Sequence, residues 1–166
     1  MPPTVRLLPA VDGDRDFVAS VWRAVAPLYD PLLPGAFAYE ARIVERRGLS
    51  SRYDTLLVHA GEARIGFAGI TRLRPRTAYL AQLYVLPAWQ RQGHGAAALR
   101  QLETWVPDAD ELVLHVHRQA SWARAFYVRQ GYDVWAADEP ASRTWGDGVL
   151  AGWTPPATLL LGRRWR

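Results

Sequence analysis

The chain of 166 residues is long enough for one domain with a full hydrophobic core, and its lack of cysteine excludes disulfides, thiolate metal sites and a cysteine nucleophile. With 49% hydrophobic residues and no apolar run near the ~18 residues of a membrane span, the sequence predicts a soluble protein outside the membrane. The net charge of +4, from 20 basic and 16 acidic residues, suits an anionic cofactor but lacks the clustering typical of nucleic-acid binding.

The first half of the chain predicts one strand, then two helices, then two further strands. Apolar residues at helical spacing follow Asp14, so we expect a helix that Asp12 or Asp14 caps and Pro27 ends. A second helix should end at Gly48, a typical C-terminal cap. In chain order, the expected elements are a strand over 4–8, helices over 14–26 and 36–47, and strands over 56–60 and 65–71.

The second half continues in the same mixed manner. Ser121 can cap a helix that buries Trp122, Ala125 and Phe126, and residues 138–156, rich in Pro and Gly, are expected to form a long loop. No repeat or linker is present, so residues 1–166 should form a single domain. The expected elements are a strand over 79–86, a helix over 95–106, a strand over 112–117, a helix over 121–130, and strands over 132–135 and 157–162.

Two glycines, Gly93 and Gly95, stand between an apolar strand and a helix. They let the backbone turn tightly and leave the first-turn amides of the helix uncovered. These N–H groups and the positive end of the helix dipole favour an anion such as a phosphate, and Arg91 adds a full charge. The spacing fits neither a P-loop nor a dinucleotide-binding fingerprint.

Two motifs resemble the GNAT superfamily of N-acetyltransferases. Residues 90–95, Gln-Arg-Gln-Gly-His-Gly, are similar to its Q/R-x-x-G-x-G/A signature and follow a Leu-x-Val-x-Pro strand end. Further on, Leu114-x-Val116, Ala123, Phe126-Tyr127 and Gly131-Tyr132 are similar to its later pattern. The resemblance implies an α/β fold: a central, mostly antiparallel sheet of about seven strands flanked by four helices.

The resemblance also implies acetyl-coenzyme A (acetyl-CoA) as co-substrate. The glycine loop would bind its pyrophosphate, and the backbone amides of the preceding strand would hold its pantetheine arm. The residues implied are Leu83, Tyr84, Val85, Gln90, Arg91, Gln92, Gly93, His94, Gly95 and Ala96. For His94 we expect the backbone N–H, rather than the imidazole, to contribute.

The sequence departs from the family pattern at two places. Ala120 stands where an Asn commonly helps to hold coenzyme A, so this contact is missing or is replaced by Ser121. Relatives often carry a carboxylate near Ala81 and Gln82, and neither residue here can act as a base. These departures keep open a non-catalytic acyl-CoA-binding sensor or partner module.

Candidate catalytic residues follow from the same resemblance. Tyr127 matches the general acid that protonates the departing sulfur, the alternative being a half-buried helix tyrosine. His117, on one strand face with His115, is a candidate base; a hydrogen-bonded sheet histidine and a water relay are alternatives. His115 and His117 could bind a metal as a pair, but the sequence offers no obvious third ligand, so no metal site is predicted. Aromatic residues that could wall an acceptor pocket, or pack in the core, are Tyr29, Phe37 and Tyr39.

The expected function is therefore transfer of an acetyl group from acetyl-CoA to a primary amine by direct attack, without a covalent enzyme intermediate. The amine, a small molecule or a peptide terminus, cannot be identified from the sequence. We expect a cytoplasmic enzyme without nucleic-acid or membrane partners, and the frequency of dimers in the family leaves a homodimer open. A tryptophan-rich interaction domain is a third alternative.

Overall fold

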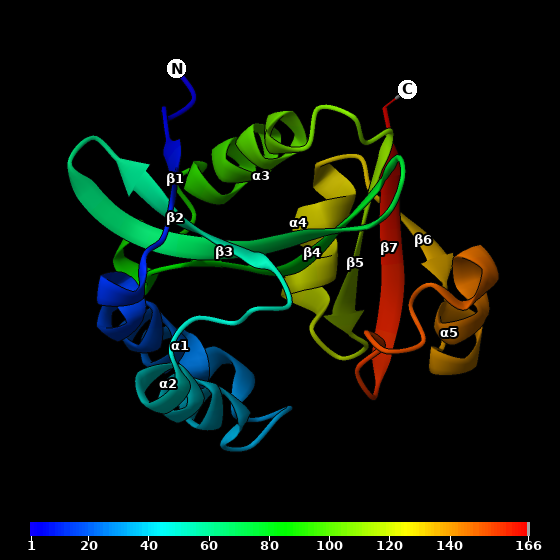
Figure 1. Cartoon of the computed structure of the whole chain (residues 1–166), viewed down its shortest axis with the longest axis horizontal. Coiled ribbons are helices and arrows are strands. Elements are labelled where there is room, and N and C mark those ends of the chain that lie inside the picture. Colours follow the sequence, from blue (N-terminus) through cyan, green and yellow to red (C-terminus); the bar gives the residue numbers. More distant parts are fainter. Residues whose placement is uncertain (166) are drawn as a thin grey trace. The chain divides into compact units, whose positions relative to one another are not determined.

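A computed structural model describes residues 1–165 (Figure 1). In this part of the chain, seven strands form a mixed sheet in the order β1-β2-β3-β4-β5-β7-β6. The strands are β1 (Arg6–Pro9), β2 (Asp54–Ala60), β3 (Ala63–Arg74), β4 (Thr77–Val85), β5 (Glu111–His117), β6 (Asp133–Ala136) and β7 (Thr158–Arg164). The α-helices are α1 (Arg15–Tyr29), α2 (Ala36–Arg47), α3 (His94–Trp105), α4 (Ser121–Arg129) and α5 (Glu139–Gly148). The predicted mixed α/β class is confirmed, with α5 added to the four helices expected.

The chain divides into two compact units. The first unit comprises Met1–Ile70 and Gln82–Trp105, and the second comprises Thr71–Ala81 and the chain from Val106 onward. Strands β3 and β4 contribute residues to both units, so neither unit is a separate stretch of sequence.

In the first unit, α1 and α2 lie on one side of strands β1–β3 and α3 lies on the other (Figure 1). Strand β2 pairs antiparallel with both β1 and β3. The core between the two helices and the sheet is apolar and centred on Trp22, whose ring contacts Phe37, Phe67 and Tyr84. This core fixes α2 over the C-terminal half of β4.

Helix α1 differs from expectation at both ends. It runs to Tyr29 and contains Pro27, which was expected to end it. Pro27 lacks an N–H for the Arg23 carbonyl, but both residues are exposed and water can satisfy that carbonyl. At the other end Asp14 does not cap the helix, since its carboxylate accepts a hydrogen bond of 2.9 Å from the Val11 amide.

In the second unit, β4 and β5 form a parallel pair from Thr77–Glu111 to Leu80–Leu114. Strand β7 then pairs antiparallel with both β5 and β6. The parallel pair follows from the connection, because the chain returns to the sheet through α3 rather than through a hairpin.

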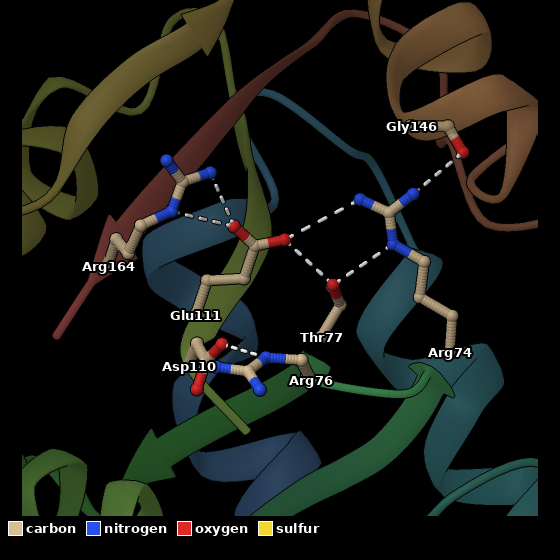
Figure 2. A network of polar contacts seen from close by, with 7 residues as sticks. All are labelled: Arg74, Arg76, Thr77, Asp110, Glu111, Gly146 and Arg164. Atoms are coloured by element: carbon tan, nitrogen blue, oxygen red, sulfur yellow. Dashed lines mark hydrogen bonds and ion pairs between the residues drawn. The ribbon is translucent and has the colours of Figure 1, made fainter. Parts of the chain in front are cut away.

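A polar network joins four strand ends in this unit (Figure 2). The buried carboxylate of Glu111 accepts hydrogen bonds from the Thr77 hydroxyl (2.7 Å) and from Nη2 of Arg164 (2.8 Å). Arg74 lies 3.6 Å from it and also bonds Thr77 and the Gly146 carbonyl. Beside it Arg76 pairs with Asp110. Burial raises the pKa of Glu111, but bonds from Arg164 and Thr77 and the charges of Arg164 and Arg74 outweigh this and lower it.

The segment 138–156, expected to be a loop, contains α5. Asp138 caps this helix by accepting a hydrogen bond from the Ala141 amide at 2.8 Å, and Pro140 lies in its first turn. The backbone leaves helical geometry at Trp145, Gly146 and Asp147. The prediction of a structureless segment was therefore wrong, although its Gly-rich second half is irregular.

Candidate functional site

The glycine loop begins with a short 3₁₀ turn, Pro87–Trp89, at the end of β4 and continues into α3 at His94. Gly93 has φ +86°, in the left-handed region that favours glycine, and Arg91 has φ +58°. A Cβ on Gly93 would also lie 3.0 Å from Cδ of Pro3. The predicted need for glycine at this turn is thus explained by backbone angle and by space.

Each backbone carbonyl from Val85 to Trp89 accepts a hydrogen bond. The Leu86 and Pro87 carbonyls accept from the backbone amides of Trp89 and Gln90. The other three accept from side chains of the motif: Gln90 Nε2 to Val85 (2.8 Å), Gln92 Nε2 to Ala88 (2.9 Å) and His94 Nδ1 to Trp89 (3.1 Å). The side chains of Gln90, Gln92 and His94 therefore hold the loop together.

The N-terminal end of α3 presents backbone donors next to this loop. Arg91, Gln92 and Gly93 are exposed, and the first-turn amides of α3, at His94, Gly95 and Ala96, have no partner one turn earlier within the helix. The helix dipole and the Arg91 guanidinium add positive potential. This arrangement can bind a phosphate or pyrophosphate through backbone N–H groups.

The C-terminal half of β4 extends past its pairing with β5. Residues Thr77–Leu80 are buried, whereas Ala81–Tyr84 are only partly buried although β4 is an inner strand. The Tyr84 ring packs in the core against Trp22, at 4.9 Å between ring centroids, so its side chain is structural. The backbone of Leu83, Tyr84 and Val85 remains the candidate for holding a pantetheine arm.

Helix α4 in the second unit carries Tyr127, which is half-buried and contacts the rings of Phe126 and Tyr132 edge-on. Trp122 and Ala125 are exposed, so the prediction that they face inward was wrong. The partly buried residues are instead Ala123, Phe126 and Tyr127, so the helix face that packs on the protein differs from the face that the apolar pattern predicted.

The N-terminus of α4 also differs from expectation. The capping position is Ala120, and the Ser121 hydroxyl makes no capping bond. Ala120 is 1% exposed, while Ser121 is exposed. A side chain at position 120 is therefore enclosed by the protein, whereas the Ser121 side chain is open to solvent.

The two histidines of β5 are held differently. Nδ1 of His115 lies 2.9 Å from the Tyr79 hydroxyl, and its buried Nε2 has no hydrogen-bond partner in residues 1–165. Burial lowers the pKa of His115 to about 4. His117, at the strand end, accepts a hydrogen bond of 3.1 Å from the Gln119 amide at Nδ1, so its neutral ring carries the proton on Nε2.

Sequence reasoning missed a half-buried carboxylate on α2. Glu40 lies on the same helix face as the buried residues Phe37, Ala41 and Val44. Burial raises the pKa of its carboxyl. The signal was available, since an acidic residue at these spacings interrupts the apolar stripe of the helix. Of the predicted aromatic wall, Phe37 is buried, Tyr29 is partly buried and Tyr39 is 55% exposed.

Within residues 1–165, no group of three His, Asp or Glu side chains could hold a metal ion. None of the helices there has the length and apolar character that crossing a bilayer requires. A shallow cavity of about 410 Å³ in the first unit is lined by the loop before β2, with Ser50 and Tyr53, and by Trp105. It includes no residue of the glycine loop.

Fold and loop together define an α/β protein in which a glycine-rich turn joins an inner strand to a helix and exposes backbone amides that can bind a phosphate. The model of the Acetyltransferase (GNAT) family matches residues 22–132, so the chain belongs to this family. The resemblance inferred from the motifs is thereby confirmed. The family uses acetyl-CoA as acyl donor.

Solved structures share the fold at low sequence identity. An acetyltransferase from Thermus thermophilus is 20% identical with a TM-score of 0.72, covering 97% of both chains. The PaiA N-acetyltransferase from Thermoplasma acidophilum, in complex with coenzyme A, is 18% identical with a TM-score of 0.69, covering 98% of this chain and 99% of that one. The ribosomal-protein-S18-alanine N-acetyltransferase from Escherichia coli is 18% identical with a TM-score of 0.66, covering 97% and 94%. Comparison with curated protein sequences found no relative.

Proposed function

We propose that the protein is an N-acetyltransferase that moves the acetyl group of acetyl-CoA to a primary amine. The observation that supports this most directly is the glycine loop, in which motif side chains donate to the carbonyls of Val85, Ala88 and Trp89, and the first-turn amides of α3 are left for an anion. Family membership supports acyl transfer, and the N-acetyltransferases among the structural neighbours support an amine acceptor.

When bound, acetyl-CoA supplies an activated thioester that a neutral amine can attack directly. In our proposal the amides of Arg91 to Ala96 hold the pyrophosphate, and the β4 backbone from Leu83 to Val85 orients the pantetheine arm. Positioning of the two reactants then supplies much of the rate enhancement. Ser121 is the proposed hydroxyl contact in place of the missing Asn.

For proton transfer, we assign Tyr127 as the general acid that donates to the sulfur. A base on this chain is less well supported. In His117 the Nδ1 lone pair is already used by the Gln119 amide, so accepting a proton there would break that bond. We therefore favour a water relay for the proton of the amine, with His117 as the second candidate.

The glycine loop provides the test of this proposal. Gly93→Ala forces an L-residue to φ +86° against Pro3, at a cost of about 1–2 kcal/mol in the native loop geometry. Calorimetry should show coenzyme A affinity at least about tenfold weaker, equivalent to ~1.4 kcal/mol. Gly13→Ala is the control, because nothing lies within 4 Å of its added Cβ. Equal affinity in both variants would remove the loop from cofactor binding.

The second candidate is an acyl-CoA-binding sensor or partner module. The enclosed Ala120, at the position of the usual Asn, is the observation that favours it. Thiol release from acetyl-CoA with a panel of primary amines distinguishes the two: binding without turnover identifies the sensor. A cytoplasmic location, a homodimer and a single domain remain predictions.

A further inference from the structure

A residue near the start of the chain packs on the glycine loop. The side of Gly93 on which another amino acid would carry its Cβ faces the Pro3 ring, since that Cβ would lie 3.0 Å from Cδ and 3.3 Å from Cγ of the proline. Apart from the chain neighbours of Gly93, these two ring carbons are the only atoms of residues 1–165 within 4 Å of the position. Pro3 is partly buried, whereas Pro2 and Thr4 on either side of it are exposed. Pro3 is therefore the residue of this segment that contacts the loop.

The strand that follows Pro3 holds its ring in place. Val5 is 3% exposed and Leu7 is 8% exposed, and β1 contacts α3, the helix that follows the glycine loop. Leu7 also pairs with Val58 on β2, so the segment is fastened to the sheet shortly after Pro3. Proline fixes its own φ at about −65°. The position of the ring is thus set by buried residues of the first unit, which also contains the loop.

The loop has a backbone conformation that needs support from its surroundings. Arg91 has φ +58°, in the left-handed region that a residue with a Cβ rarely adopts, and Gly93 has φ +86°. Such a conformation persists only where the surrounding contacts determine it. Three side chains of the motif provide part of this support by donating to loop carbonyls. Pro3 supplies the contact at Gly93.

The contact supports the loop without competing for its donors. The ring carbons Cγ and Cδ of Pro3 carry no hydrogen-bonding group, so they leave the first-turn amides of α3 to an anion. A site whose donors are already held in the bound arrangement loses less conformational entropy when the ligand binds. Rigidity that Pro3 gives to the loop should therefore strengthen the binding of the anion.

We propose that Pro3 is a positioning residue that holds the glycine loop in the conformation that binds a pyrophosphate group. The identity of the anion as coenzyme A rests on the proposed function, whereas the support of the loop by Pro3 does not. Pro3 packs on the loop rather than on a proposed catalytic residue, so its loss should weaken coenzyme A binding and leave the chemical step unchanged. The KM for acetyl-CoA should then rise, while kcat and the KM of the amine stay constant.

The first test needs no ligand. Hydrogen exchange of the full-length protein, followed by mass spectrometry, reads the amides of Trp89, Gln90 and Ala97, which hydrogen bond within the loop and the first turn of α3. These amides should exchange several-fold faster in Pro3→Ala than in the wild type. Pro2→Ala is the matched control, because Pro2 is the same residue type in the same segment but is exposed. The amides of β5, in the second unit, should exchange at the wild-type rate in both variants.

The second test measures coenzyme A binding by calorimetry. The affinity should fall about threefold to tenfold in Pro3→Ala and stay at the wild-type level in Pro2→Ala. Unchanged exchange in the loop, an equal rise in β5, or unchanged or tighter coenzyme A binding overturns the proposal, and so does a fall in kcat at constant KM. Failure of the wild type to bind coenzyme A instead overturns the proposed function, and the exchange comparison still decides whether Pro3 supports the loop.

Discussion

His115 is a partly buried histidine whose environment makes the fold sensitive to acid. Its folded-state pKa of about 4 lies below the ordinary value of 6.5, so the unfolded chain binds more protons between these two values. Stability is therefore complete above about pH 6.5 and falls as the pH approaches 4. The loss can reach up to about 3 kcal/mol.

The substitution His115→Gln tests this prediction. Glutamine retains a group that can hydrogen bond the Tyr79 hydroxyl but does not titrate. Urea unfolding at intervals from pH 8 to pH 4 should show a smaller decline of the unfolding free energy in the variant than in the wild type. Parallel declines over that range would show that His115 is not the source.

Tyr127 supports a kinetic prediction at the same scale. In Tyr127→Phe the ring contacts with Phe126 and Tyr132 can remain while the proton donor is lost. Turnover should fall by roughly 10²-fold or more, as for loss of a general acid. Coenzyme A affinity, measured by calorimetry, should stay within about twofold of the wild type, by the same argument as for any group that acts only in the chemical step. Unchanged turnover would remove Tyr127 from the mechanism.

Individual residues were predictable from the sequence where one local rule decides their role. Gly93 was such a case, because a tight turn before a helix requires its backbone angle. The bonds of Gln90 and Gln92 to the loop carbonyls were not, since they depend on how the turn folds back on β4. Glu40 was missed because its importance depends on burial, which only tertiary packing creates.

Among the elements, the clearest success was helix α2, whose predicted bounds agree with the structure because a C-terminal glycine ends it. The expectation that proline ends a helix failed at Pro27 in α1, because solvent can satisfy the carbonyl that proline leaves without a partner. The prediction also failed for α5, where we gave the Pro and Gly content of the segment more weight than the Asp138 cap. Which face of a helix is buried also depends on its neighbours, and α4 shows this for Trp122.

The Glu111 network stabilises the packing of several elements. One carboxylate on β5 contacts residues at the ends of β3, β4 and β7 through hydrogen bonds and ion pairs (Figure 2). Glu111→Gln would leave Arg164 and Arg74 without their shared counter-charge. The side chains of Arg164 and Arg74 are 65% and 37% exposed, so water can solvate them, and we expect a loss of about 1.5–3 kcal/mol in the unfolding free energy, as for hydrogen bonds to a charged group. Urea unfolding at pH 7 measures it.

The control for Glu111 is Glu62→Gln, because Glu62 is fully exposed and lies 3.8 Å from Arg6. This change should leave the unfolding free energy close to that of the wild type, because an exposed ion pair contributes little. The pH dependence gives a second check. Because the pKa of Glu111 is lowered in the fold, its stabilisation is present above the unfolded pKa and is lost as the pH falls through the folded one. Glu111→Gln should lack this part of the acid transition.

For the whole molecule, the order of elements was predictable because strands, helices and turn residues punctuate the chain clearly. The family followed from two short motifs in the right order, and the match over residues 22–132 confirms it. The division into two units was not expected, since no linker in the sequence marks it. Its boundaries fall inside β3 and β4, where a sequence pattern shows only continuous strands.

These shared strands predict a single unfolding transition. The chain passes between the units at residues 70–71, 81–82 and 105–106, and the first two crossings lie within β3 and β4. Melting one unit would remove hydrogen bonds from strands that the other also needs, so the two should unfold together. Calorimetric and van't Hoff enthalpies should then agree. Glu111→Gln in the second unit should lower one common midpoint, read equally by tryptophan fluorescence and by helix circular dichroism. Two separated transitions, with only one shifted by the substitution, would instead establish two independently folding domains.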